Sequence, residues 1–144
     1  MARKSTKSDL TTRLQAIPLF ASCSRRDLSA IAGIVKEVEF DKGEVICREG
    51  DSGVGLHVVV EGKTKVQVGG RTVRRLEPGA FFGEIALLDG GPRSATVIAE
   101  TPVKTMSIAA WNFRSVLKSH PNLAVRMLEE VCRRLRSTNA SLSH

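Results

Sequence analysis

Residues 63–83 read KTKVQVGGRTVRRLEPGAFFG, and they indicate which kind of fold the chain adopts. In the first half of this stretch apolar and polar residues alternate, which is typical of a strand with one buried face. Thr64, Val66 and Val68 are therefore expected on one face of a strand, with polar residues on the other. The paired glycines that follow mark a turn. The stretch predicts a strand, a turn and a second β-run.

Similar turn signals recur about every ten residues from Val38 to Met106, and they separate seven short β-runs. This spacing favours an all-β sandwich or barrel over alternating strands and helices. On either side the patterns are helical: Leu10–Lys36 predicts two short helices, Trp111–Lys118 a third, and Asn122–Ser141 a longer fourth. The sequence thus predicts an α+β fold, in which helices bracket a closed β core.

The second of these helices has a recognisable start. Ser24 and Asp27 stand three residues apart, as in a capping box, where each side chain bonds the other residue's backbone N–H. Pro18 breaks the segment before it, because proline lacks the N–H that a helix interior needs. We expect one helix to end near Pro18 and the next to begin after Ser24.

The last helix carries an apolar stripe with a four-three alternation. Its positions are Ala124, Leu128, Val131, Leu135 and Leu142, with Thr138 between the last two. Because the stripe spans fewer than three heptads, we expect it to pack against the chain's own β core. A helix that dimerises, or that docks on another protein, is the alternative.

Composition bounds the size and class of the protein. The 144 residues, 42% hydrophobic and 26% charged, suit one globular domain; we expect a basic arm over residues 1–13 and a single domain over 14–144. Apolar runs are too short for a membrane helix, and the basic N-terminus lacks the apolar core of a secretory signal. The net charge of +7 is spread along the chain, which favours solvated helix faces and tails over a specific nucleic-acid site.

Cysteine and histidine usage predicts a reduced, cytoplasmic protein without a metal site. The three cysteines are odd in number and far apart, so we expect buried, reduced thiols. The three histidines show no metal-ligand spacing either.

Residues 81–97, FFGEIALLDGGPRSATV, hold the chemistry of a ligand site. Gly83-Glu84 is expected to open one helical turn between strands, and the free N–H groups at such a start bind anions. Gly83 lets a ligand approach the backbone closely. Glu84 would repel a phosphate, but its carboxylate accepts hydroxyl groups strongly. The first half of the motif therefore suits a ligand that carries both.

Arg93 supplies the cation of the same motif. A guanidinium binds a phosphate through two parallel N–H bonds, and each charge-assisted bond contributes roughly 1.5–3 kcal/mol. The small residues Ser94 and Ala95 let their backbone amides reach the same anion. Sugar hydroxyls on one side and one phosphate on the other describe a nucleotide monophosphate. The alternative is a plain ion pair between Glu84 and Arg93, with the glycines serving the fold.

The full string FFGEIALLDGGPRSATV closely resembles the phosphate-binding cassette of cyclic nucleotide-binding domains. Glycine-punctuated turns at 48–53 and 61–62, and the IPLF stretch at 17–20, are similar to other parts of that family. The likeness extends over residues 14–142, and it is to the sensor half of catabolite-activator regulators and to the domains of bacterial channels. The resemblance implies a β-roll or jelly-roll-like barrel flanked by N-terminal helices and two C-terminal helices.

The resemblance also implies roles within the cassette. Glu84 would accept the ribose 2′-OH, and Arg93 would clamp the cyclic phosphate. The backbone amides of Ala86 and Ser94 would join Arg93 on the phosphate, while Ile85 would pack the short helix. The ligand-binding set implied in this way is Gly83, Glu84, Ile85, Ala86, Arg93, Ser94 and Ala95.

Two positions depart from the family pattern. Val54 and His57 stand where the family usually has the aspartate and the aromatic residue of a GDxxY sequence. We expect His57 to be a half-buried barrel residue rather than a ligand contact. These departures touch the scaffold and leave the cassette intact.

The sequence CRRLRSTNASL at 132–142 resembles the corresponding helix of the catabolite-activator regulators, where a threonine contacts the adenine. Thr138 falls at that position. In bacterial channel relatives an arginine of this helix stacks on the purine, and Arg134 falls there. The alternative is that both are solvated helix residues.

Together these features predict a cytoplasmic cyclic nucleotide receptor that is not an enzyme and uses no cofactor. Ser94 favours cAMP over cGMP, because a threonine at this place often accompanies cGMP binding. Binding would fold the C-terminal helix over the purine as a lid. Since the chain ends at His144 without an effector domain, a stand-alone sensor would signal to an effector protein in trans. We expect no membrane or specific nucleic-acid partner.

Two alternatives from other classes stay open. One is a structural module that forms a homodimer, or docks on a partner, through the last helix. The other is non-specific nucleic-acid binding through the basic tails, like an activator without its reading head.

Overall fold

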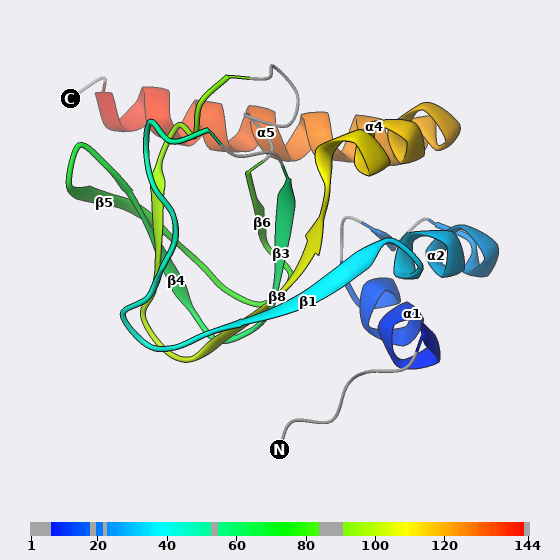
Figure 1. Ribbon diagram of the computed structural model, residues 1–144. Coiled ribbons are helices and arrows are strands. Elements are labelled where there is room, and N and C mark those ends of the chain that lie inside the picture. The colour runs from blue at the N-terminus through cyan, green and yellow to red at the C-terminus, as the bar shows by residue number, and fades with distance from the viewer. Residues whose placement is uncertain (1–6, 18–19, 22, 53–54, 84–90, 143–144) are drawn as a thin grey trace.

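The computed structural model describes residues 7–17, 20–21, 23–52, 55–83 and 91–142 (Figure 1). Side chains are described within these ranges except at 7–8, 110–111 and 138–142. The helices are α1 (Lys7–Gln15), α2 (Arg25–Ala32), α4 (Ala110–Ser119) and α5 (Pro121–Leu142). The strands are β1 (Val35–Phe40), β2 (Val45–Cys47), β3 (Leu56–Glu61), β4 (Thr64–Val68), β5 (Arg71–Leu76), β6 (Phe81–Phe82), β7 (Thr96–Ala99) and β8 (Val103–Ile108).

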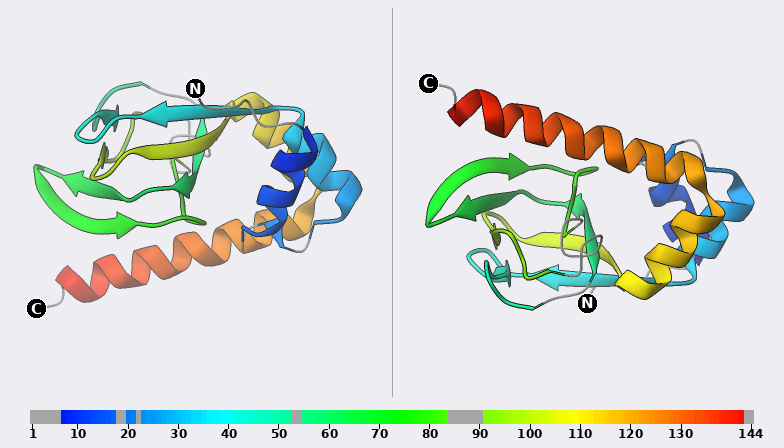
Figure 2. Two further views of the ribbon diagram at one scale, coloured as in Figure 1. Left: turned by 90° about the horizontal axis from the view of Figure 1, so that it is seen from below. Right: turned by 90° about the horizontal axis from the view of Figure 1, so that it is seen from above.

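Two antiparallel sheets of four strands form a jelly-roll-like sandwich. The strand order is β1-β8-β3-β6 in one sheet and β2-β7-β4-β5 in the other. The helices α1, α2 and α4 gather at one end of the sandwich, while α5 runs along it (Figure 1, Figure 2). This arrangement confirms the predicted α+β fold, with a β barrel between N-terminal helices and two C-terminal helices.

Most element boundaries follow the sequence pattern, and three features differ. α1 begins at Lys7, inside the stretch expected as a basic arm. The helical pattern expected to reach Lys36 gives way to β1 at Val35, because residues 35–40 pair in register with β8. Phe81 and Phe82 form a two-residue strand of their own.

β4 confirms most of the predicted alternation. Thr64 and Val66 are buried, whereas Lys65 and Gln67 are half-buried. The prediction is wrong for Val68, whose side chain is 43% exposed. The pairing with β5 shifts register after Val66, and the hairpin then projects beyond the sheet (Figure 1).

Buried side chains form two cores on opposite faces of the sheet that contains β3 and β6. The larger core lies between this sheet and the helices and includes Phe20 and Phe113, both fully buried. The smaller core lies between the two sheets: Val59, Val66, Leu76, Phe82 and Val97. Because side chains alternate along a strand, Phe81 belongs to the larger core and Phe82 to the smaller one. Each large apolar side chain buried in this way contributes roughly 1.5–3 kcal/mol.

The capping box at the start of α2 is confirmed. The Asp27 N–H donates to the Ser24 hydroxyl at 3.1 Å, and the Ser24 N–H donates to an Asp27 carboxylate oxygen at 3.4 Å. Asp27 also contacts a residue far along the chain. Its carboxylate lies 3.5 Å from Nδ1 of His120, the residue between α4 and α5.

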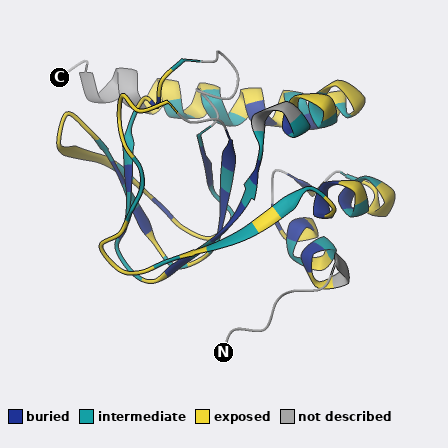
Figure 3. Cartoon of the chain, viewed as in Figure 1, coloured by how far each residue is buried: buried dark blue, intermediate teal, exposed yellow. Residues whose placement is uncertain are grey.

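The apolar stripe of α5 is covered only in part. Ala124 and Val131 are half-buried, but Leu128 and Leu135 are each 58% exposed, so the prediction that the stripe packs against the β core is wrong for these two leucines. Val125, next to the stripe, is 52% exposed. The covered face is offset from the stripe and carries Leu123 and Met127, each 1% exposed. Figure 3 shows exposed residues along the outer side of α5.

The prediction of buried thiols is correct only in part. Cys23 and Cys47 are half-buried, but Cys132 is exposed on α5, and none of these three cysteines forms a disulfide. Among the helices that the structure describes, none is both long and apolar enough to cross a membrane.

Candidate anion-binding site

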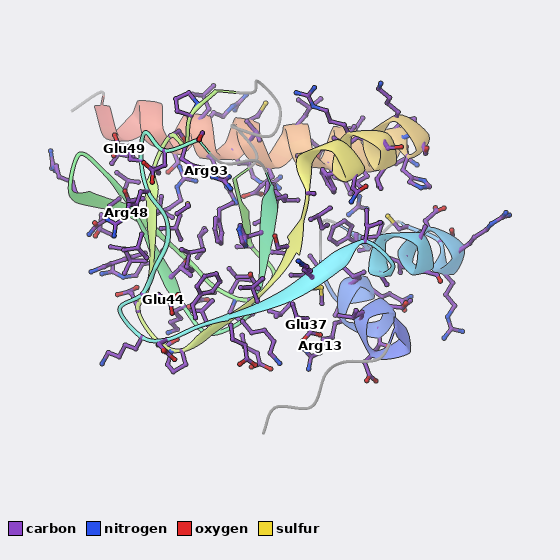
Figure 4. The ribbon with its side chains drawn as sticks, in the orientation of Figure 1. Arg13, Glu37, Glu44, Arg48, Glu49 and Arg93 are labelled. Carbon is purple, nitrogen blue, oxygen red and sulfur yellow. The ribbon has the colours of Figure 1, made fainter. Side chains whose placement is uncertain are left out.

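The backbone of Arg93 is held by hydrogen bonds to Gly50 and Asp51, in the turn after β2. The Gly50 N–H donates to the Arg93 carbonyl at 2.8 Å, and the Arg93 N–H donates to the Asp51 carbonyl at 2.9 Å. Figure 4 shows Arg93 and Glu49 at the same end of the sandwich. Main-chain hydrogen bonds therefore fix the position of Arg93 independently of the contacts of its side chain.

The Arg93 side chain points into the sandwich rather than into solvent. Arg93 is 8% exposed, and its Nη1 donates to the Gly55 carbonyl at 3.1 Å and to the Gly83 carbonyl at 3.5 Å. Gly55 directly precedes β3, and Gly83 directly follows β6. The guanidinium thus lies at the mouth between two neighbouring strands.

The positive charge of Arg93 has no carboxylate partner in the part of the chain that the structure describes, where its side chain bonds carbonyl oxygens only. Taking an unpaired charge out of water costs several kcal/mol. A guanidinium also has five N–H donors, more than these two contacts use. The described residues therefore leave Arg93 with an uncompensated charge and with N–H donors that an anion could accept.

Gly83 is required by the packing around Arg93. Its φ is +92°, in the region that favours glycine, and a Cβ there would lie 2.5 Å from the Gly55 carbonyl oxygen and 2.6 Å from Arg93 Nη1. A side chain would displace one of the two. The structure thus adds a steric reason for this glycine to the close ligand approach that the sequence predicts.

The structure describes some of the predicted site residues and not others. Gly83 and Arg93 are brought together as the motif predicts, and Ser94 (exposed) and Ala95 (half-buried) lead from Arg93 into β7. Glu84, Ile85 and Ala86 lie outside the described residues. The ion pair between Glu84 and Arg93, the alternative interpretation of the motif, therefore stays untested.

Arg134 is not a solvated helix residue, so that alternative is wrong for this position. Its side chain is 13% exposed, and Nη2 donates to the Phe81 carbonyl. The guanidinium carbon lies 4.5 Å from the Phe81 ring centroid, and Nε lies 3.4 Å from a Glu130 carboxylate oxygen. Thr138 lies on α5, but its side chain is outside the description.

A groove of about 460 Å³ separates α5 from the turn before β6. Its lining comes from Gly79, Ala80, Phe81, Arg126, Glu129, Glu130, Arg133 and Arg134. Gly83 and Arg93 do not line this groove, which lies at the Phe81 end of β6. The two arginines that the sequence predicts as ligand contacts therefore lie at opposite ends of one short strand, Arg134 at Phe81 and Arg93 at Gly83.

His57 is half-buried in β3, as predicted, and it pairs with Phe82 of β6. The imidazole stacks on the Phe82 ring at 5.0 Å between centroids and 8° between planes. Its Nδ1 lies 3.1 Å from the hydroxyl oxygen of the buried Thr105. Burial, and secondly the charge of Arg93, lower the pKa of His57 to about 4. The ring is therefore neutral at pH 7 and lies within the field of Arg93.

Three residues that hold the two arginines were not predicted: Gly55, Phe81 and Glu130. Gly55 is 38 residues from Arg93 along the chain, so no local pattern indicates the contact. Glu130 and Arg134 are four residues apart on a helix, and this spacing is the signal that identifies such a pair.

The sequence profile of the family described as "Cyclic nucleotide-binding domain" matches residues 37–120. A cyclic nucleotide-gated potassium channel of Mesorhizobium japonicum is 39% identical over 109 residues, which are 76% of this chain and 30% of the channel. A CRP-like cAMP-activated global transcriptional regulator of Mycobacterium tuberculosis is 31% identical over 123 residues, or 80% of this chain and 55% of the regulator. The chain thus spans about a third to just over half of these relatives.

A solved structure supports the same assignment. The catabolite activator protein of Thermus thermophilus superimposes with a TM-score of 0.78 at 28% identity, covering 88% of this chain and 62% of that one. The likeness to activator regulators and to bacterial channels that the sequence indicates is confirmed. The chain belongs to the cyclic nucleotide-binding domain family.

Proposed function

We propose that this protein is a cyclic nucleotide receptor in which Arg93 binds the cyclic phosphate. The observation that carries the proposal is the buried Arg93 guanidinium, whose partners among the described residues are two carbonyl oxygens and no carboxylate. A phosphate accepts two parallel N–H bonds from such a group and neutralises its charge. Family membership supports the same ligand class.

The remaining contacts follow the cassette that the sequence predicts. Glu84 accepts the ribose hydroxyl, and the backbone amides of Ala86 and Ser94 join Arg93 on the phosphate. We propose cAMP rather than cGMP as the ligand, because Ser94 stands where a threonine often accompanies cGMP binding. No cofactor and no catalytic step are part of this proposal.

The proposed signal is a movement of α5. Arg134 is bonded to the Phe81 carbonyl and to Glu130. If Arg134 is to stack on a purine it must exchange these contacts for the ligand, and α5 must shift with it. A ligand that favours the shifted position would change the population of the two states. An effector protein in the cytoplasm, bound in trans, would respond to the exposed side of this helix.

Isothermal titration with cAMP and with cGMP tests the proposal. We expect micromolar or tighter binding that weakens by about a hundredfold or more in Arg93→Ala, because two charge-assisted bonds of roughly 1.5–3 kcal/mol each are lost. Arg93→Lys separates charge from geometry, since it keeps the charge but loses the two-pronged contact. Arg71→Ala, which removes an exposed arginine from the start of β5, is the control. Equal affinity in Arg93→Ala and in the control, with both proteins folded, overturns the proposal.

A second candidate function, self-association through α5, is supported by an exposed row that differs from the predicted stripe and contains Val125, Leu128 and Leu135. Cys132 is also exposed, so this row follows three-four-three spacing, which lets a second copy of the same helix pack against it. We expect light scattering to show a dimer that Leu128→Lys converts to a monomer. Val73→Lys, at an exposed apolar residue of β5, is the control. A wild-type protein that stays monomeric at high concentration rules this candidate out.

A further inference from the structure

The pairing between β3 and β6 is unusually short. It consists of two residue pairs, His57 with Phe82 and Val58 with Phe81. The two carbonyls that hold Arg93 lie just beyond these pairs: Gly83 directly follows Phe82, and Gly55 is two residues before His57. Two further main-chain bonds join Val59 of β3 to Gly79 and Ala80, just before β6, so the Phe81 end of this strand is well anchored. Both carbonyls that hold Arg93 lie toward the other end, where side-chain contacts of the His57–Phe82 pair also determine their position.

His57 makes contacts that hold this short ladder. Its ring stacks on Phe82 of β6, meets the Phe40 ring of β1 edge-on at 6.4 Å, and places Nδ1 3.1 Å from the Thr105 hydroxyl of β8. Three strands thus pack against one imidazole. We propose, on the basis of the proposed function, that His57 is a positioning residue for Arg93 and that ligand binding at Arg93 takes up a proton on His57.

The charges around His57 set the direction of this linkage. The side chains that pack against it from β1, β6 and β8 (Phe40, Phe82 and Thr105) carry no charge, and Arg93 is the charged group that acts on it within the described ranges. Burial and then Arg93 lower the pKa of His57 from its ordinary 6.5 to about 4. An anion on Arg93 cancels part of that positive field, so the pKa rises when ligand binds.

The sign of the effect follows from this rise. A group with a higher pKa in the bound state binds its proton together with the ligand, so affinity increases as the pH falls below the bound-state pKa. If the pKa returned from about 4 to 6.5, binding would be about twentyfold tighter at pH 5 than at pH 7. Burial is the larger cause and persists in the complex. We therefore expect a gain of several-fold, below that limit.

Titration calorimetry with cAMP at about pH 7 and pH 5 measures this gain. His57→Phe keeps a ring on Phe82 but cannot titrate, so its affinity should not share the gain, and the difference between the two proteins cancels the titration of other groups. His57→Ala removes the stack as well. It should weaken binding at both pH values, and His57→Phe should recover most of the loss at pH 7. Equal pH dependence in wild type and His57→Phe overturns the proposal.

A second measurement needs no nucleotide. Removing the charge with Arg93→Gln should raise the pKa of His57 in the free protein, as followed by NMR of the imidazole signals. Arg71→Gln, which removes an exposed charge, should leave that pKa where it is. An unchanged pKa in Arg93→Gln overturns the coupling between the two side chains. Absence of cAMP binding, with this pKa raised as expected, instead overturns the proposed function alone.

Discussion

Replacing Gly83 by alanine should disturb the protein at the point where Arg93 is held. The new Cβ would lie 2.5 Å from the Gly55 carbonyl oxygen, whereas ordinary contact begins at 3.4 Å, so that carbonyl has to retreat by about 0.9 Å. Overpacking of this kind costs roughly 1–3 kcal/mol. For a chain of this size the loss corresponds to a fall in Tm of about 3–10 °C.

Gly43 provides the matched control, because its φ of +87° is close to the +92° of Gly83 but a Cβ there meets nothing within 4 Å. Both substitutions carry the same backbone strain, of about 1–2 kcal/mol, and the same change in the entropy of the unfolded chain. The difference between Gly83→Ala and Gly43→Ala in urea unfolding therefore isolates the steric contact. Equal losses of stability in the two variants would refute the packing described around Arg93.

Three further substitutions test other contacts. Ser24→Ala removes the helix cap and should cost about 0.5–2 kcal/mol in urea unfolding, whereas Ser115→Ala on the exposed side of α4 should be close to neutral. Arg134→Ala should speed amide hydrogen exchange in β6 and α5 by an amount equivalent to about 1–2 kcal/mol; the same result with Arg133→Ala, whose side chain is 66% exposed, would contradict this role. Because folding lowers the pKa of His57 from 6.5 to about 4, the unfolded chain binds more protons between those values. Stability should accordingly fall by up to about 3 kcal/mol from pH 6.5 to pH 4 in wild type, and an equal fall in His57→Phe would show that other groups cause it.

Local patterns predict the fold well because they report local causes. Alternation identifies β4 up to Val66, and the spacing of Ser24 and Asp27 identifies the start of α2. The alternation fails at Val68, where a register shift in the pairing with β5 decides which way the side chain points. A register shift is a property of two strands, and neither sequence alone contains it.

The stripe on α5 shows a second limit. Periodicity identifies the faces of a helix, but it does not say which face the rest of the chain covers. Leu128 and Leu135 are apolar and exposed, whereas Leu123 and Met127 on the offset face are buried. The covered face is the one whose Leu123 and Met127 join the larger core, and identifying it requires the packed structure.

The ligand site likewise combines contacts that a local motif predicts with contacts that only strand pairing creates. Gly83 and Arg93 are ten residues apart in the sequence, so one short motif contains both, and the structure brings them into contact. The Gly55 carbonyl and the stack of His57 on Phe82 depend on strand pairing across the sheet. The motif therefore predicts which groups would face a ligand, and the structure adds what holds them in position.

The shortness of β6 bears on how mutations in this domain act. Arg134 on α5 bonds the carbonyl of Phe81, and Arg93 bonds the carbonyl of Gly83, so both arginines depend on the same three residues. The side chains of these residues also divide between the two cores, with Phe81 in one and Phe82 in the other. The connection between the Arg93 site and α5 thus runs through only a few residues, 81–83, that a mutation could alter. Most substitutions elsewhere will change either the stability of the fold or the affinity for ligand. Substitutions at 81–83 will change both together, so stability and affinity cannot vary independently at these positions.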